Sequence, residues 1–242
     1  MYAVLFVFVL VTVHAAEEIP SYIHVCGRND PNYSQCIVDN INNVNNKICQ
    51  TGLPELNVDP VESIKADEII IYNTNNLKLS LKDSKIKGFC DFEVHSLQVS
   101  PDKLRFDFGF IVKHLDMDSV YDFDIRVLIP LANKGLAHIS TDDVEGKIIV
   151  DWKEETKNGK TEIYAANVKT RLMIKSFKYK FDDSEKDLVQ LHEAISNVIN
   201  ESEKDVISKV TPALEETVSK LVISVVNNVT LHRFEQLFPN EA

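Results

Sequence analysis

Hydrophobic and polar residues alternate along the middle of the chain, from about Leu77 to Phe181. The apolar positions that share a parity form several runs: Leu77, Leu79 and Leu81; Ile86, Cys90, Phe92 and Val94; Leu104, Phe106, Phe108 and Phe110; Tyr121, Phe123, Ile125, Val127 and Ile129; Ile148, Val150 and Trp152; Tyr164, Ala166, Val168, Leu172 and Ile174. Such alternation gives each strand one solvent-exposed (wet) face and one buried (dry) face, which is typical of an antiparallel sheet. The phase changes near Lys175-Ser176, which indicates a bulge or a break between strands. Asn158-Gly159 predicts a hairpin turn between two of the strands.

Two other segments repeat with a helical period of three and four residues. A short helix is predicted from about Tyr33 to Cys49, with Ile37, Ile41, Val44 and Ile48 on one face. A longer pattern runs from Glu185 to Val226 and would measure roughly 60 Å as one continuous helix. Pro212 lies inside it and should bend or interrupt it. The stripe lacks a clean heptad, so a coiled coil is the second choice, and we expect the dry face of the sheet to curl around this helix.

The N-terminal segment 1–16 is apolar and carries no Lys, Arg, Asp or Glu before the charged pair Glu17-Glu18. It is short for a membrane span and ends in two small residues, which favours a cleaved secretory signal over a buried N-terminal strand. We therefore expect a secreted protein whose residues 17–242 form a single domain. Acidic residues outnumber basic ones 37 to 26, giving a net charge of −11, which argues against nucleic acid and anionic membranes as partners. No integral membrane association is expected, and we expect a monomer.

Four cysteines lie within the first 90 residues, an even number that suits an oxidising compartment. Three pairings are formally possible, and Cys26–Cys36 is the most local. Cys49 would then pair with Cys90 by elimination, with two unpaired core cysteines as the alternative. The spacings do not match a zinc site. Glycosylation acceptor triplets begin at Asn32, Asn200 and Asn228, so a glycoprotein is expected.

The sequence gives little support to catalysis. It contains no G-x-S-x-G, H-E-x-x-H, Gly-rich phosphate loop or G-x-G-x-x-G motif, and its seven histidines are scattered. Asp116 and Asp118 are expected in a turn, and Asp122 and Asp124 on the wet face of a strand, without the glycine and glutamate of a calcium loop. We expect no metal, no cofactor and no enzymatic activity. A hydrolase with a dispersed active site and a secreted lipid-interacting scaffold are the alternatives.

Several short motifs, taken in order, carry a family resemblance. They are Cys26 with Asp30-Pro31 and Cys36-Ile37, the segment Gly52-Leu53-Pro54-Glu55-Leu56, Lys87-Gly88-Phe89-Cys90-Asp91-Phe92, Val127-Leu128-Ile129-Pro130-Leu131-Ala132-Asn133-Lys134-Gly135, Asp143-Val144-Glu145-Gly146, and Leu237-Phe238-Pro239. Together they make the chain resemble the insect takeout and juvenile-hormone-binding proteins over nearly its whole mature length. The second cysteine pair departs from the pattern, because the hormone carriers' second disulfide uses the C-terminal half, and this favours a takeout-like carrier.

The resemblance implies an α+β fold in which a strongly curved antiparallel sheet wraps one long C-terminal helix and encloses an apolar tunnel. It also implies a carrier of a small elongated hydrophobic ligand, such as a juvenile-hormone-like terpenoid or a fatty acyl compound. Phe106, Phe108, Phe110, Tyr121 and Phe123 are expected in a solid core. The candidate ligand-binding residues are Leu53, Leu56, Trp152, Tyr164, Val222, Val226, Phe234 and Phe238. Trp152 and Tyr164 offer a polar tip on an apolar body, which suits the orientation of an ester, epoxide or carboxyl end.

Overall fold

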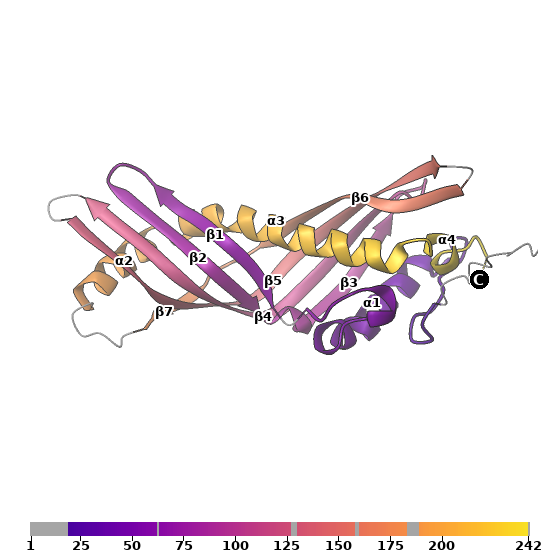
Figure 1. Cartoon of the computed structure of the whole chain (residues 1–242), viewed down its shortest axis with the longest axis horizontal. Helices are drawn as coiled ribbons and strands as arrows, with labels where there is room; N and C mark the ends of the chain where they lie inside the picture. The colour runs from indigo at the N-terminus through magenta and orange to yellow at the C-terminus, as the bar shows by residue number, and fades with distance from the viewer. Residues whose placement is uncertain (1–18, 62, 127–129, 158–159, 183–188, 242) are drawn as a thin grey trace, which may run out of the picture.

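A computed structural model describes residues 19–61, 63–126, 130–157, 160–182 and 189–241 of the chain. One antiparallel sheet and a long C-terminal helix dominate it (Figure 1). In chain order the elements are α1 (Tyr33–Gln50), η1 (Pro54–Leu56), β1 (Ile64–Asn73), β2 (Leu77–Lys87), η2 (Phe89–Asp91), β3 (Phe92–Val99), β4 (Arg105–Arg126), β5 (Pro130–Lys157), β6 (Lys160–Met173), β7 (Lys178–Phe181), α2 (Val189–Glu201), α3 (Glu203–Thr230) and α4 (Phe234–Leu237). The α+β class and the curled antiparallel sheet are as predicted.

The sheet is organised around two very long strands, β4 and β5. The strand order is β1-β2-β4-β5-β6, while β3 also pairs with β4 and β7 with β5. The alternating runs around Phe106 and Tyr121 therefore belong to one 22-residue strand rather than to two. The aspartates at 116 and 118 lie within β4, so the predicted turn there is wrong. Asp122 does lie on the wet face, where its carboxylate binds Lys82 at 2.9 Å and Lys134 at 3.0 Å.

The inward face of β4 changes parity halfway along the strand. Phe106, Phe110 and Val112 are buried in the first half, whereas the odd-numbered residues from Leu115 to Phe123 are buried in the second. The facing strand β5 changes in the same place, where Asp143 has a φ of 52°, in the left-handed region. Since side chains alternate strictly across a strand, this irregularity lets both halves of the sheet present their apolar side to the same interior.

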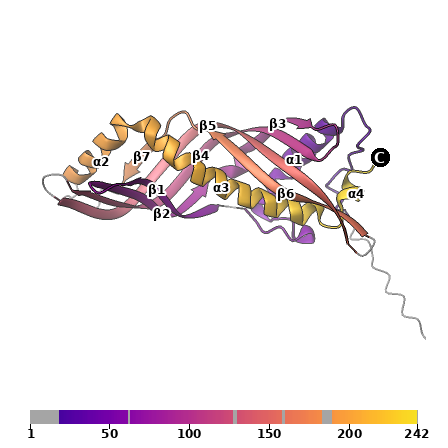
Figure 2. The ribbon, with the colours of Figure 1, turned by 90° about the horizontal axis from the view of Figure 1, so that it is seen from above.

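The helical C-terminal segment is divided into two helices. α2 ends at Glu201 and α3 begins at Glu203, because Ser202 leaves the helical region with φ −132° and ψ 28°. The prediction of one continuous helix is therefore wrong at Ser202, while its predicted start at Glu185 lies outside the described residues. Pro212 is inside α3 and does not interrupt it, since its side chain is exposed and its missing N–H falls on the solvent side. α3 crosses the open side of the sheet from α2 to α4 (Figures 1 and 2).

Asparagine side chains connect two helices to two edges of the sheet. Asn227 of α3 accepts from the N–H of Ala165 at 2.8 Å and donates to its carbonyl at 3.1 Å. Asn42 of α1 repeats this arrangement with Val94 of β3, at 2.9 and 2.8 Å. The side-chain amide forms the two hydrogen bonds that the backbone of a neighbouring strand would otherwise form with this residue. The edges of β6 and β3 are therefore covered at these positions.

Both predicted disulfides are present. Cys26 pairs with Cys36, and Cys49 pairs with Cys90, so no cysteine is free among the described residues. The first bridge lies next to the C-terminus, where the N–H of Cys26 donates to the carbonyl of Leu237 at 2.9 Å. The second ties the last turn of α1 to η2.

Besides the helix start at Glu185 and the strand positions Val127 and Ile129, two further sequence predictions fall on parts of the chain that the structure does not describe. They are the signal segment 1–16 and the Asn158-Gly159 turn, although β5 and β6 pair up to Lys157 and Lys160 on either side of it. The change of phase near Lys175-Ser176 is a break between strands, since β6 ends at Met173 and β7 starts at Lys178. Within the described ranges, no helix has the length and hydrophobicity needed to cross a membrane.

Candidate functional site: an apolar cavity

A cavity of about 410 Å³ lies between the dry face of the sheet and the helices. Four walls can be distinguished: the sheet, α1, α2 and α3. The residues of α3 on the wall extend from Val206 to Thr230, a distance of about 36 Å at 1.5 Å per residue. The cavity borders both large apolar clusters of the core, one near α1 and one near α2. It is therefore a long space that follows the helix.

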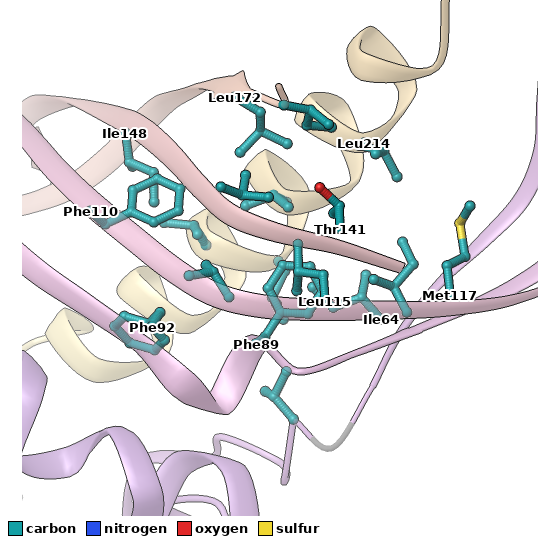
Figure 3. A pocket seen from close by; sticks show the side chains of 18 of the residues that line it. Ile64, Phe89, Phe92, Phe110, Leu115, Met117, Thr141, Ile148, Leu172 and Leu214 are labelled. Carbon is teal, nitrogen blue, oxygen red and sulfur yellow. The ribbon is translucent and has the colours of Figure 1, made fainter. Parts of the chain in front are cut away.

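The centre of the cavity is lined almost entirely by carbon (Figure 3). Figure 3 shows side chains from the sheet, from η2 and from α3 around the same space: Ile64, Phe89, Phe92, Phe110, Leu115, Met117, Thr141, Ile148, Leu172 and Leu214. Thr141 is the one labelled side chain with a polar atom besides the Met117 sulfur, and its hydroxyl donates to the carbonyl of Ser176 at 2.8 Å. The centre of the cavity therefore offers a ligand a large apolar contact surface but few groups that could form hydrogen bonds.

The wall carries almost no charge. Among the described lining residues there is no Lys, Arg or Glu, and the charged types are limited to Asp116 and His24. Asp116 is exposed, and its carboxylate lies 3.2 Å from Nε2 of His114. His24 is also exposed, next to Asn40, whose side chain bonds both backbone groups of His24 at 2.7 Å. The lining residues that the structure describes therefore include no Lys or Arg that could neutralise a buried anionic head group.

Five of the eight residues proposed from the sequence border this cavity: Leu53, Trp152, Val222, Val226 and Phe238. Trp152 is 8% exposed and packs at its ring faces and edges against Phe106 and Phe234, with centroids 5.5 and 4.9 Å away. Its indole Nε1 is buried and has no hydrogen-bond partner in the described part of the chain. The structure thus brings these five side chains, from different elements, to the same cavity, while their contact with a ligand stays a prediction.

The other three residues, Leu56, Tyr164 and Phe234, do not border this cavity, and their contact with a ligand also stays a prediction. Tyr164 is out of phase because β6 has a bulge: Asp151 pairs with Asn167 but Trp152 pairs with Ala165, which leaves one extra residue between them. Ala165 consequently faces inward, and Tyr164 does not.

Leu56 and Phe234 are buried, but behind the wall rather than in it. Leu56 packs in a small separate cluster with Leu53 and Val58. Phe234 supports Trp152 and Phe238 from behind, at 4.9 and 5.1 Å between ring centroids. Both side chains therefore support residues of the lining without forming it.

Residues of α1 and aromatic residues of β4 also line the cavity, although they were not among the ligand-binding residues predicted from the sequence. The stripe Ile37, Ile41, Val44 and Ile48 faces the cavity, and it was visible in the sequence as the apolar face of the predicted helix. The residues expected in a solid core, Phe106, Phe108, Phe110 and Tyr121, also border the cavity, whereas Phe123 does not. No sequence signal distinguishes a wall from a core here, because both are apolar.

Within the described ranges, the structure shows no group of three or more side chains able to hold a metal ion. Comparison with curated protein sequences gives no match.

Comparison with solved structures identifies relatives of the fold. Takeout 1 of Epiphyas postvittana aligns with a TM-score of 0.66 and 16% sequence identity, over 85% of this chain and 94% of that one. A lipopolysaccharide binding protein aligns at 0.43 and 13% identity, over 84% of this chain and 40% of that one. Latherin aligns at 0.22 and 16% identity, over 68% and 70%. The first likeness establishes the fold.

The strongest relationship comes from the family model of haemolymph juvenile hormone binding proteins, which matches residues 4–239. The match covers nearly the whole chain, and the Takeout 1 likeness supports it. The chain therefore belongs to the haemolymph juvenile hormone binding protein family.

Proposed function

We propose that this protein is a secreted, monomeric carrier that binds one elongated hydrophobic molecule in the cavity and shields it from water. The observation that carries this proposal is the long apolar cavity along α3 in a chain of the juvenile hormone binding family. Secretion is supported by the signal-like segment 1–16 and by two disulfides. The carrier is proposed as a binding protein without catalysis, because its family is named for hormone binding.

The proposed ligand is a juvenile-hormone-like terpenoid or a fatty acyl compound, in an uncharged form. A carboxylate inside the cavity would lose its hydration without meeting a cation, since the described wall contains no Lys or Arg. An ester, an epoxide or an alcohol avoids this cost. The wall therefore favours the ester over the corresponding free acid.

Burial of the chain supplies the affinity. A ligand of about 15 carbons gains roughly 0.8 kcal/mol per methylene, or about 12 kcal/mol gross before association and ordering costs. Micromolar or tighter binding is within reach of that gain without any charged contact. Hydrogen bonds between the ligand and the protein would then determine the orientation of the ligand in the cavity.

Trp152 is the residue we propose to orient the polar end. It borders the cavity, and its indole N–H has no partner among the described residues, so a ligand acceptor would relieve a buried donor. Leu53, Val222, Val226 and Phe238 would provide the apolar contacts around it. Replacing Trp152 by Phe keeps an aromatic ring and removes the hydrogen-bond donor. The substitution should weaken the binding of an ester about threefold to tenfold and leave the affinity for a hydrocarbon of equal length unchanged.

The test uses delipidated full-length protein and a fluorescent apolar probe, displaced by a matched pair of a long-chain methyl ester and its acid at pH 8. The ester should displace the probe at micromolar concentration, and the acid at least tenfold less effectively. Ile148→Trp fills the centre of the cavity and should weaken probe binding at least tenfold, whereas Ile70→Trp, on the exposed outer face of β1, should leave it unchanged. A wild-type protein that binds neither the probe nor any member of a panel of terpenoids and acyl esters is not a carrier.

A further inference from the structure

A ligand of this size must enter an interior that is covered by helices in both halves of the molecule. α2 lies at one end, and α1 lies in the opposite half of the molecule, beside β3 (Figures 1 and 2). Both put isoleucines on the cavity wall, Ile37 and Ile41 from α1, and Ile195 and Ile199 from α2. The two helices differ greatly in how they are attached to the rest of the protein, and this difference identifies the route of entry.

α1 is fixed covalently near both of its ends. Cys36 in its first turn is bridged to Cys26, and Cys49 in its last turn is bridged to Cys90. Between the bridges, Asn45 donates to the carbonyls of Cys90 and Phe92 at 3.0 and 2.8 Å, in addition to the Asn42 contacts with β3. A displacement of α1 would break these hydrogen bonds and still be limited by two covalent links.

α3 is fixed by hydrogen bonds to the backbone of β6. Besides Asn227, Ser219 Oγ accepts from the N–H of Thr170 at 2.9 Å and Glu215 accepts from the N–H of Leu172 at 2.9 Å. These bonds replace the ladder that a further strand would form along this edge. The α3–β6 seam is consequently closed.

Among the described side chains, α2 shows neither a disulfide nor a side-chain bond to the backbone of a sheet edge like those of α1 and α3. No disulfide reaches it, because all four cysteines are paired near α1. It packs on the sheet through apolar side chains that include Ile195, and through hydrogen bonds of tyrosines: the hydroxyl of Tyr179 donates to Asn200 Oδ1 at 3.0 Å, and that of Tyr121 lies 3.0 Å from His192 Nε2. The chain leaves the helical conformation at Ser202, immediately before the firmly held α3.

We propose that α2 is the lid of the cavity: it swings about Ser202 to admit and release the ligand, and the Tyr179–Asn200 hydrogen bond is its latch. This inference rests on the proposed carrier function and adds the route of exchange. Opening removes Ile195 and Ile199 from the wall and exposes the end of the cavity between α2 and β7. Closing buries them again over the bound ligand, so a filled cavity should stabilise the closed position.

The test clamps α2 by a chemical cross-link. Since the described native cysteines are all paired, a short bis-maleimide will react only with introduced thiols in Tyr179→Cys/Asn200→Cys. The matched control is Tyr72→Cys/Asp205→Cys, which replaces an equivalent contact, a tyrosine hydroxyl donating to a side-chain oxygen at 2.9 Å, between β1 and α3. Each double variant treated with N-ethylmaleimide serves as the unclamped reference. Stopped-flow fluorescence measures association and release of the apolar probe.

Clamping α2 should slow both association and release at least tenfold and leave the equilibrium affinity within twofold, while clamping β1 to α3 should change neither rate. The proposal is overturned if the α2 clamp has no effect, which would place entry beside α1 near His24 and Asn40, or if the control clamp slows exchange equally. Failure of wild-type protein to bind the probe would instead refute the carrier function.

Hydrogen exchange on the unmodified protein gives a second, independent measurement that requires no variant. Amides of α2 should exchange at least 100-fold faster than those of α1, and saturating ligand should slow α2 selectively. Equal protection of the two helices would contradict the lid.

Discussion

Asn227 offers a sharp test of how the long helix is held. Asn227→Ala removes two hydrogen bonds, to the N–H and to the carbonyl of Ala165, and Ala165 is only 2% exposed. Two lost bonds cost about 2 kcal/mol, and leaving buried backbone groups without partners adds to this, so the unfolding free energy should fall by about 2–4 kcal/mol.

The assay is urea denaturation followed by the fluorescence of Trp152, which is the single tryptophan of the chain and is buried in the core. The midpoint should fall while the slope m stays constant, because the surface exposed on unfolding is nearly unchanged. Asn228→Ala is the matched control: the neighbouring side chain makes one exposed hydrogen bond, to the carbonyl of Asn57 at 2.7 Å, and its loss should cost less than about 1 kcal/mol. Both variants are compared as unglycosylated protein.

An unfolding free energy of Asn227→Ala within 0.5 kcal/mol of wild type would refute the reasoning. It would mean that the edge of β6 is satisfied by water once the amide is gone, and that apolar contacts alone hold α3 in place.

Three further predictions concern stability and ionisation. Removing the Cys49–Cys90 bridge by a double alanine substitution should lower the unfolding free energy by about 4 kcal/mol, from the entropy of a loop closed over 41 residues, measured by the same denaturation. The carboxylate of Asp142 raises the pKa of His114, so Asp142→Asn should lower that pKa in an NMR titration. Because the pKa of His114 is higher in the folded protein than in the unfolded chain, any stabilisation from this pair is complete below the unfolded-state pKa and is lost as the pH rises through the folded-state pKa. Gly146→Ala should lower the unfolding free energy by about 1–3 kcal/mol, because the added Cβ would clash with the ring of Phe110 on β4, and an unchanged unfolding free energy in the same denaturation would show that the ring can move aside.

Much of the fold follows from local periodicity. The alternation around Leu79, Phe106 and Tyr121 marks strands because one face of the sheet is wet, and the stripe of α1 marks a helix for the same reason. The disulfides followed from an even count of cysteines in a chain with a signal-like segment. These are properties of neighbouring residues, and the sequence displays them directly.

The errors arose where a single residue changes the phase. The extra residue in β6 places Ala165 rather than Tyr164 toward the interior, and the change of buried parity within β4, opposite Asp143, makes one long strand look like two. Ser202 divides the helix, although the apolar stripe continues on both sides of it. Each of these features depends on how two distant segments pair, which a periodic pattern within one segment does not contain.

The hollow interior has its own physical cause, which lies in how the helix is attached. An amphipathic helix laid on a curved apolar sheet would normally collapse onto it, because close packing maximises dispersion contacts. Here Glu215, Ser219 and Asn227 bond α3 to the backbone at the edge of β6, while the Cys49–Cys90 disulfide and Asn42 hold α1 against η2 and β3. The polar bonds are directional and would be lost if the helices moved inward, so the apolar faces stay apart across the concave sheet. A protein that only needed a stable core would gain from closing that space, and the fixed separation therefore supports a cavity kept open for an apolar guest.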